Sequence, residues 1–139
     1  MAADLAGKVA LITGVGRPGQ IGHAVAEAAG RAGARLVITD RNATALAERE
    51  RELASRGVAV RAAAADLATP DGARGVVLEA RRAFGGLDVV VNVAGGFFYF
   101  GPFPEASPEV LDRELTVNLK TAFFMCQAAI PVLVERGGG

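Results

Sequence analysis

The chain alternates short apolar runs with longer segments in which apolar residues return every three or four positions. Uninterrupted apolar runs are typical of buried β-strands, whereas the longer spacing is typical of helices with one buried face. The runs predict four strands, at residues 8–13, 35–39, 58–64 and 87–91. The periodic segments predict four helices, at residues 21–32, 45–55, 70–84 and 108–134. Because strands alternate with helices, we expect an α/β fold with a parallel sheet.

The order of the elements narrows this expectation to one architecture. Right-handed crossovers between parallel strands place helices on both faces of the sheet. We therefore predict a three-layer, Rossmann-type fold with strand order 3-2-1-4, in a single domain over residues 1–139. Ligands of such folds bind at the carboxyl ends of the strands, at the switch point between the first and fourth strands.

The helical spacing also predicts which side chains face the sheet. In the first helix the inward residues should be Ile21, Ala24, Val25, Ala28, Ala29 and Ala32. In the second they should be Leu46 and Leu53, and in the third Val76, Val77, Ala80 and Phe84. In the last they should be Leu111, Leu115, Leu119, Ala122, Phe123 and Ile130. Asn42 or Thr44 should cap the second helix, Ser107 and Pro108 suit the start of the last, and Pro131 should kink or weaken its final turn.

A cluster of glycines separates the first strand from the first helix. Residues 9–22 read V-A-L-I-T-G-V-G-R-P-G-Q-I-G. Glycines let the backbone turn sharply and approach a pyrophosphate, and the helix N-terminus then offers free N–H groups and the positive end of its dipole. The turn therefore predicts a dinucleotide site, with candidate residues Gly14, Gly16, Arg17, Gly19, Ile21 and Gly22. The alternative is a turn that only needs positive φ angles, with Arg17 as a solvated loop residue.

Asp40 bears on the choice of cofactor. It closes the second strand, about twenty residues after the glycines, where an acidic group accepts hydrogen bonds from the ribose hydroxyls. A 2′-phosphate would be repelled there by about 4 kcal/mol per charge pair at 4 Å and an effective dielectric constant of 20. The sequence thus favours NAD, while Arg41 leaves NADP possible if Asp40 turns away. A simple turn aspartate is the alternative interpretation of Asp40.

The composition limits the partners and the compartment. The formal net charge is zero and 51% of the residues are apolar, so no basic excess points to nucleic acid. Cys126 is the single cysteine, which excludes an internal disulfide and favours a reducing compartment. The first residues do not resemble a signal peptide, and no uninterrupted apolar segment has the length of a membrane span. We expect a cytoplasmic protein without a membrane partner.

Three further features allow an interpretation from the sequence. His23 is the single histidine, so no metal site is expected, and we interpret it as an exposed helix residue near the phosphates. Cys126 lies in an apolar stretch and should be a small core or interface residue. The aromatic residues of loop 97–107 either floor a substrate pocket or pack on residues outside this chain. They are Phe97, Phe98, Tyr99, Phe100 and Phe103.

Taken together, four motifs in this order resemble those of the short-chain dehydrogenase/reductase family. They are Thr13-Gly14 followed by Ile21-Gly22, then Asp66-Leu67, Asn92-Val93-Ala94-Gly95 and Val117-Asn118-Leu119. The resemblance extends from Lys8 to Gly138. The glycine turn is about two residues longer than the family's pattern, with Gln20 where the family has glycine, so either Gly16 or Gly19 takes the middle role. Val93 replaces the second asparagine of the family's Asn-Asn-Ala-Gly motif.

The resemblance implies an NAD(P)-dependent oxidoreductase that acts on a carbonyl compound or secondary alcohol, such as a 3-oxoacyl thioester, a sugar or a steroid. It assigns cofactor contacts to Asp66, Leu67, Asn92, Ala94 and Gly95. It also makes Asn118 the residue that helps to hold a proton-relay water, whereas the alternative is a helix asparagine that bonds neighbouring backbone. The alternative interpretation of Asp66 is an aspartate before a helix start, which is common, but its position in the motif set favours adenine contact.

The family's catalytic serine and Tyr-xxx-Lys pair have no counterpart in the 139 residues. Tyr99 is the single tyrosine, and neither Lys8 nor Lys120 stands at the required spacing from it. We therefore expect the cofactor-binding half of such an enzyme, truncated before strand five and inactive alone. The alternatives are a catalytically inactive NAD(P)-binding or assembly module, and a non-functional fragment with an exposed fourth strand. Family resemblance also implies a homo-oligomer formed through the last helix.

Overall fold

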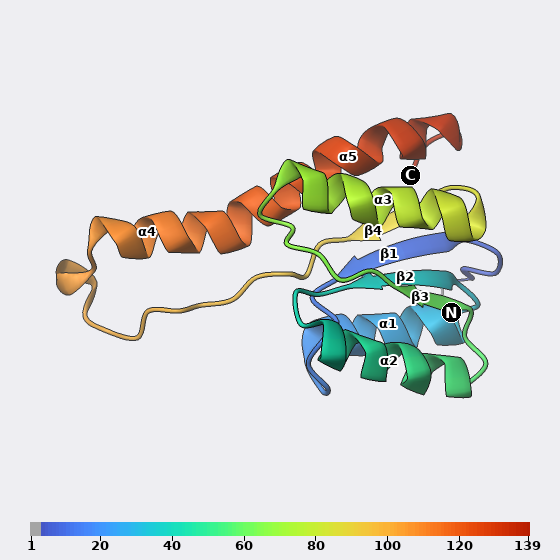
Figure 1. Ribbon diagram of the computed structural model, residues 1–139, viewed down its shortest axis with the longest axis horizontal. Helices are drawn as coiled ribbons and strands as arrows, with labels where there is room; N and C mark the ends of the chain where they lie inside the picture. Colours follow the sequence, from blue (N-terminus) through green and yellow to red (C-terminus); the bar gives the residue numbers. More distant parts are fainter. Residues whose placement is uncertain (1–3) are drawn as a thin grey trace.

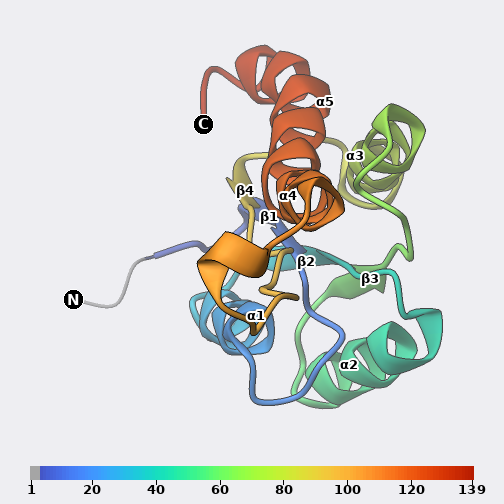
Figure 2. The ribbon, with the colours of Figure 1, turned by 90° about the vertical axis from the view of Figure 1, so that its left-hand side faces the viewer.

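A parallel four-stranded sheet lies between two layers of helices in the computed structural model, which describes residues 4–139 (Figure 1). The strand order is β3-β2-β1-β4, as the sequence predicted. The strands are β1 (Val9–Thr13), β2 (Arg35–Thr39), β3 (Val60–Ala62) and β4 (Val89–Val91). Figures 1 and 2 show α1 (Ile21–Arg31) and α2 (Ala43–Ser55) on one face, and α3 (Pro70–Phe84) and α5 (Thr121–Glu135) on the other.

The central strand β1 supplies side chains to both layers. Ala10 and Ile12 pack with the residues of α1 and α2, whereas Val9 and Leu11 pack with those of α3 and α5. Leu11 is in register with Val37 of β2 and with a residue of β4. Every residue of β1 is buried because both faces of a parallel sheet are covered.

The two outer strands are shorter than the sequence predicted. The predicted ranges 58–64 and 87–91 reduce to Val60–Ala62 and Val89–Val91. Among the described residues, β3 pairs with β2 and β4 pairs with β1, each on one side. Each outer strand pairs with only the three central residues of its five-residue neighbour, and an apolar run does not record where that pairing stops.

The buried face of α1 differs from the predicted one. Its buried residues are Gly22, His23, Ala26 and Ala29, of which the sequence predicted Ala29. Ile21 was expected inward and is 71% exposed. A Cβ atom on Gly22 would lie 2.2 Å from the carbonyl oxygen of Gly14. This close backbone approach determines which face of α1 turns toward the sheet. Alanines lie on several faces of the helix, so their spacing in the sequence did not indicate this face.

The helices α2 and α3 agree with the sequence prediction. The Asn42 side chain caps α2 by accepting a hydrogen bond from the Ala45 amide at 3.1 Å, so Asn42 and not Thr44 is the cap. Leu46 and Leu53 are buried beneath α2. Helix α3 begins after Thr69, ends at Gly85 in the left-handed conformation, and buries three of its predicted inward residues, with Phe84 half-buried. The three are Val76, Val77 and Ala80.

The last predicted helix is continuous but contains a π-helical segment. It consists of α4 (Pro108–Leu115), the π-helix η2 (Thr116–Lys120) and α5, and it continues past Pro131 to Glu135. A short 3₁₀ helix, η1 (Phe103–Glu105), precedes it. Ser107 precedes α4 as predicted, although its side chain makes no capping hydrogen bond.

The predicted inward face of this helix is wrong. Leu111, Leu115, Leu119, Phe123 and Ile130 are exposed, and Ala122 is half-buried. The buried residues are Thr121, Met125, Ala129 and Val132, all on α5. Figure 1 shows the reason: α4 extends away from the sheet together with the preceding loop, and α5 alone lies against the body. Apolar periodicity cannot distinguish a face turned to the sheet from one without a neighbour in the chain.

By length and composition, one helix of 28 residues, Pro108–Glu135, could span a membrane. The sequence expectation concerned uninterrupted apolar segments, and polar residues such as Lys120 and Gln127 interrupt this helix. The core helices of other proteins pass the same test, and here Met125, Ala129 and Val132 pack with residues of α3 and the sheet. Glu109, Asp112 and other charged residues occupy α4.

Candidate functional site

A cavity of about 710 Å³ opens at the carboxyl ends of the four strands. Its walls are the glycine turn after β1, the residues that follow β2 and β3, the loop after β4, and η2. Most predicted cofactor residues line it: Gly14, Arg17, Gly19, Ile21, Gly22, Asp40, Arg41, Asp66, Leu67, Ala94 and Gly95. Gly16, Asn92 and Asn118 do not. The structure thus gathers residues distant in sequence, while their contact with a cofactor stays a prediction.

Glycine is required in this turn for two physical reasons. Gly14 and Gly19 have φ angles of +73° and +71°, which other residues adopt at an energetic cost. Gly14 also meets the chain after β4, because a Cβ atom there would lie 3.0 Å from the Cα atom of Ala94. The turn therefore combines positive φ angles with close packing of backbone on backbone.

The two candidates for the middle glycine differ in environment. Gly16 is buried against Asp40, and a Cβ atom on Gly16 would lie 2.7 Å from the Asp40 Cγ atom. Gly19 is exposed and lines the cavity. Gly16 therefore makes room for a carboxylate, whereas Gly19 forms the cavity wall.

Both oxygens of Asp40 accept hydrogen bonds from backbone amides. The Gly16 amide donates to Oδ2 at 2.9 Å and the Asn42 amide donates to Oδ1 at 3.0 Å. These bonds hold the carboxylate beside the turn, and each oxygen retains a further acceptor position. Arg17 and Arg41 line the same cavity, so its wall carries positively charged side chains as well as the Asp40 carboxylate.

Thr13 joins the first and fourth strand ends. Its buried Oγ1 accepts hydrogen bonds from the amides of Val93 and Ala94, both at 2.8 Å. These bonds hold the segment after β4 against the glycine turn. The sequence interpretation used Thr13 as a motif residue and did not include it among the site residues. A threonine at the end of a buried strand is the sequence feature that points to such a contact.

Asn118 holds the loop after β4 and does not line the cavity. Its Oδ1 accepts from the Gly96 amide at 2.9 Å, and its Nδ2 donates to the Gly96 carbonyl at 2.8 Å. Nδ2 also donates to Glu114 Oε2 at 3.1 Å, and Glu114 Oε1 accepts from the Phe98 amide at 2.7 Å. These contacts match the alternative of an asparagine that bonds backbone, and the proton-relay role stays a prediction. Glu114 was missed because its partners become neighbours only in the fold.

The side chains of the other two motifs make local contacts or pack in the core. Asp66 is exposed, and its Oδ1 accepts from the Ala68 amide at 3.0 Å before α3 begins. The Leu67 side chain is buried in the core. The Asn92 amide group donates to Cys126 Sγ at 3.5 Å. Cys126 itself is exposed, so its predicted place in the core is wrong and an interface role stays a prediction.

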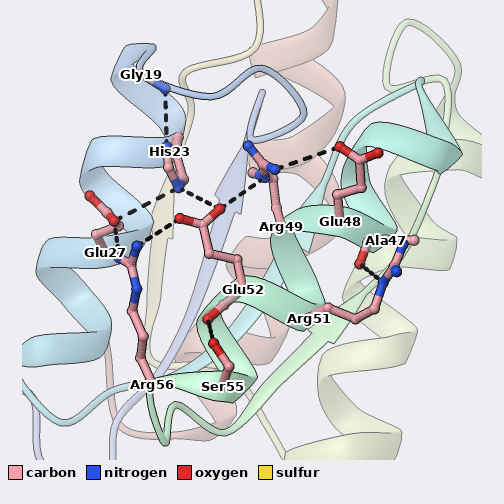
Figure 3. A network of polar contacts seen from close by, with 10 residues as sticks. All are labelled: Gly19, His23, Glu27, Ala47, Glu48, Arg49, Arg51, Glu52, Ser55 and Arg56. Atoms are coloured by element: carbon pink, nitrogen blue, oxygen red, sulfur yellow. Dashed lines mark hydrogen bonds and ion pairs between the residues drawn. The ribbon is translucent and has the colours of Figure 1, made fainter.

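His23 is buried, contrary to the sequence prediction, and belongs to a network between α1 and α2 (Figure 3). Its Nδ1 accepts from the Gly19 amide at 3.1 Å, and its Nε2 lies 3.4 Å from Glu52 Oε2 and 3.9 Å from Glu27 Oε1. Arg56 pairs with both carboxylates, and its hydrogen bond lowers the pKa of Glu27. Arg49 Nε lies 3.2 Å from Glu52 Oε2.

The same network bears on metal binding. The ligand atoms of His23, Glu27 and Glu52 lie within 4.8 Å of one another. A single histidine was the reason to expect no metal site, and that reasoning overlooked carboxylates brought in from another helix. Two guanidinium groups already neutralise these carboxylates, which opposes a cation at this position.

The aromatic loop divides into two parts. Phe97 and Phe98 line the cavity, and the Arg113 guanidinium lies 4.4 Å from the centre of the Phe98 ring. Phe100 and Phe103 point to solvent and are 88% and 90% exposed. The two sequence interpretations, the floor of a substrate pocket and packing on residues outside this chain, both stay predictions.

The sequence profile described as "short chain dehydrogenase" matches residues 8–139. The chain belongs to this family. It is 35% identical over 135 residues to 3beta-hydroxysteroid dehydrogenase 2 of Eggerthella lenta, a match that covers 97% of this chain and 51% of that protein. It is 37% identical over 134 residues to versicolorin reductase 1 of Aspergillus parasiticus, covering 96% and 50%.

Solved structures of this family share the fold. L-sorbose reductase of Gluconobacter frateurii, complexed with NADPH and L-sorbose, superimposes with a TM-score of 0.91 at 36% identity. That match covers 100% of this chain and 52% of the other. The chain thus spans about half the length of these relatives.

Proposed function

We propose that this chain is the dinucleotide-binding part of an oxidoreductase that exchanges hydride between NAD(P) and a carbonyl compound or secondary alcohol. The main support is the cavity at the strand ends, which joins the glycine turn, Asp40 and the segment after β4. Its volume of about 710 Å³ suits a ligand site, since such sites measure about 300–1,000 Å³. Family membership supports the same conclusion.

The residues present fit a dinucleotide. The open N-terminus of α1, with Gly19 and Gly22 at the cavity wall, suits the pyrophosphate. Asp40 suits the ribose hydroxyls, and Asp66 and Leu67 lie where the adenine contacts of the family resemblance are expected. Asn92 and Gly95 would contribute through the main chain and the asparagine amide, and Ala94 would permit a close approach. When bound, the nicotinamide would supply or accept the hydride.

Asp40 supports NAD as the preferred cofactor. A ribose offers hydroxyl donors to its free acceptor positions, whereas a 2′-phosphate would bring a like charge. Arg17 and Arg41 act in the opposite direction, and the similar L-sorbose reductase is complexed with NADPH. The ratio of the dissociation constants for NADH and NADPH therefore measures whether the carboxylate or the two guanidinium groups dominate.

Titration of the chain with NADH and NADPH tests the proposal. We expect tighter binding of NADH, so that the dissociation constant of NADPH exceeds that of NADH. The ratio of the NADPH to the NADH dissociation constant should fall about tenfold or more in Asp40→Asn, which keeps the shape and removes the charge. Asp40→Ala should also weaken NADH, because Gly16 and Asn42 lose their acceptor. Asp71→Asn on exposed α3 is the matched control. Absence of binding to both nucleotides would refute the proposed function, and tighter NADPH binding by the parent would refute the cofactor choice.

Catalysis would require groups beyond these 139 residues. Tyr99 is the single tyrosine, and its hydroxyl donates to the Pro102 carbonyl at 2.9 Å within the loop. This contact favours a second candidate, an NAD(P)-binding or assembly module that is catalytically inactive alone. We expect the chain to oxidise no alcohol with NAD, and clear turnover would show that another group acts as acid or base. The relatives' names span a steroid, versicolorin and a sugar, so the substrate class stays a carbonyl compound or secondary alcohol, 3-oxoacyl compounds included.

Self-association and compartment belong to the same proposal. The exposed apolar side chains of α4, η2 and α5 support a homo-oligomer formed through this helix. The single cysteine supports a cytoplasmic location, as the sequence predicted.

A further inference from the structure

The middle of the glycine turn is tied to α1 by a histidine side chain. The Gly19 amide donates a hydrogen bond to His23 Nδ1 at 3.1 Å, and the His23 side chain is 9% exposed. Gly19, Gln20 and Ile21 line the cavity on the other side of this bond. The bond therefore joins a buried helix residue to the part of the turn that faces the cavity.

Acceptance at Nδ1 decides where the ring proton lies. In a neutral imidazole one nitrogen accepts and the other donates, so the hydrogen bond from Gly19 assigns the proton to Nε2. Nε2 is buried without a hydrogen-bond partner, 3.4 Å from Glu52 Oε2 and 3.9 Å from Glu27 Oε1. The negative charge of these two nearby carboxylates favours a proton on Nε2 over a lone pair there, which stabilises the tautomer that leaves Nδ1 free to accept.

The carboxylates are held in turn by α2. Arg56 pairs with Glu27 and Glu52, and Arg49 lies against Glu52 (Figure 3). The chain of contacts runs from α2 through Glu52 and His23 to the backbone of the turn. Side-chain rotation of His23 is thereby restricted, and so is the position of the Gly19 amide.

We propose that His23 is a positioning residue for nucleotide binding, which holds the cavity-facing part of the glycine turn in place through the Gly19 amide. Gly19 has a positive φ angle and is exposed, and a glycine backbone has more conformational freedom than that of any other residue, so a side-chain contact at its amide restricts this part of the turn. A turn fixed before binding loses less conformational entropy when the phosphates bind. The effect on affinity rests on the proposed function, whereas the effect on the turn itself does not.

The test compares two substitutions of similar size. His23→Asn places its Oδ1 where Nδ1 lies and keeps an acceptor for Gly19, whereas His23→Leu has none. Hydrogen exchange of the backbone over residues 14–22 is measured without nucleotide, and NADH dissociation constants are measured below the lowest melting temperature. Leu53→Ala is the control, because it removes buried contacts of α2 without touching the turn.

In His23→Leu we expect faster exchange over residues 14–22 and an NADH dissociation constant about tenfold higher. In His23→Asn we expect values within about threefold of the parent. Leu53→Ala should lower the melting temperature and leave both readouts near the parent. Glu52→Gln should give a smaller change in the direction of His23→Leu, because the tautomer loses its charged partner.

Three results would overturn the proposal: unchanged exchange in His23→Leu, equal losses in His23→Leu and His23→Asn, or an equal loss in Leu53→Ala. If the parent binds no nucleotide, the proposed function fails, and the exchange measurement still decides the role of His23.

Discussion

Leu11 and Leu111 are leucines in two parts of the molecule, and one is buried whereas the other is exposed. Leu11 lies in β1 and is 0% exposed, whereas Leu111 lies in α4 and is 60% exposed. Every residue of β1 is buried, and no residue of α4 is. The sequence pattern predicted both leucines to be buried, Leu11 in an apolar strand and Leu111 on the inward side of the last helix, so an apolar residue in a predicted inward position is not always buried. The sheet body has a neighbour on each side, while loop 97–107 and α4 extend away from it (Figure 1).

The largest expected effect separates these two leucines directly. Leu11→Ala should lower the free energy of unfolding by about 2–5 kcal/mol, because it leaves a cavity between two packed layers. Leu111→Ala should change it by less than about 0.5 kcal/mol, since the side chain has little to lose. Urea denaturation followed by circular dichroism measures both. Equal losses would mean that α4 is packed against the body in solution.

The second effect concerns backbone packing within the body. Gly22→Ala should cost about 1–3 kcal/mol and weaken nucleotide binding, because the new Cβ atom would lie 2.2 Å from the Gly14 carbonyl oxygen. Gly75→Ala in α3 meets no atom within 4 Å and should stabilise the protein by about 0.5–1 kcal/mol through helix propensity. Thermal melts should show a lower melting temperature for Gly22→Ala and a higher one for Gly75→Ala. A Gly22→Ala protein as stable as the parent would show that α1 can shift.

The third effect concerns the contact between Asp88 and Arg136, the residue that follows α5. The hydrogen bond from Arg136, with a second from the Val9 amide, lowers the pKa of Asp88. Because the folded pKa is lowered, the charged carboxylate stabilises the fold fully above the ordinary aspartate value of about 3.9. That contribution is lost as the pH falls through the lower folded value. Asp88→Asn should therefore lower the free energy of unfolding by about 1 kcal/mol at neutral pH. The difference in unfolding free energy between this variant and the parent should disappear in acid.

Unfolding free energies of the parent and Asp88→Asn, measured from about pH 7 to about pH 2, test this dependence. Asp71→Asn is the control, since its side chain is 91% exposed. A difference that persists unchanged at the lowest pH would mean that the carboxylate charge is not what stabilises this junction.

The smallest effect on stability should accompany a large effect on assembly. Leu119→Asp and Phe123→Asp change exposed side chains and should alter the unfolding free energy by less than about 0.5 kcal/mol. If these residues form an interface, both variants should shift the protein to monomer in sedimentation experiments. Leu78→Asp, also exposed but on α3, should leave the assembly unchanged. A parent that is already monomeric would contradict the proposed homo-oligomer.

The sequence predicted which residues meet at the cavity where these residues come from strand ends, and their contact with a cofactor stays a prediction. Gly14, Asp40, Asp66 and Ala94 each follow an apolar run, and parallel strands bring their carboxyl ends to one edge. The residues that were missed or misplaced depend on contacts across elements. His23 is buried because Glu52 of α2 and the Gly19 amide meet it, and Glu114 acts through Phe98 and Asn118.

The sequence by itself determined the order of strands and helices, the 3-2-1-4 sheet and the composition of the glycine turn, because these follow from local periodicity and from the handedness of the crossovers. Only the tertiary structure decided which face of α1 is buried, which apolar residues of the long helix stay exposed, and which side chains hold the turn. Those outcomes depend on whether a neighbouring element lies within contact distance, and hydrophobic spacing along one segment does not contain that information.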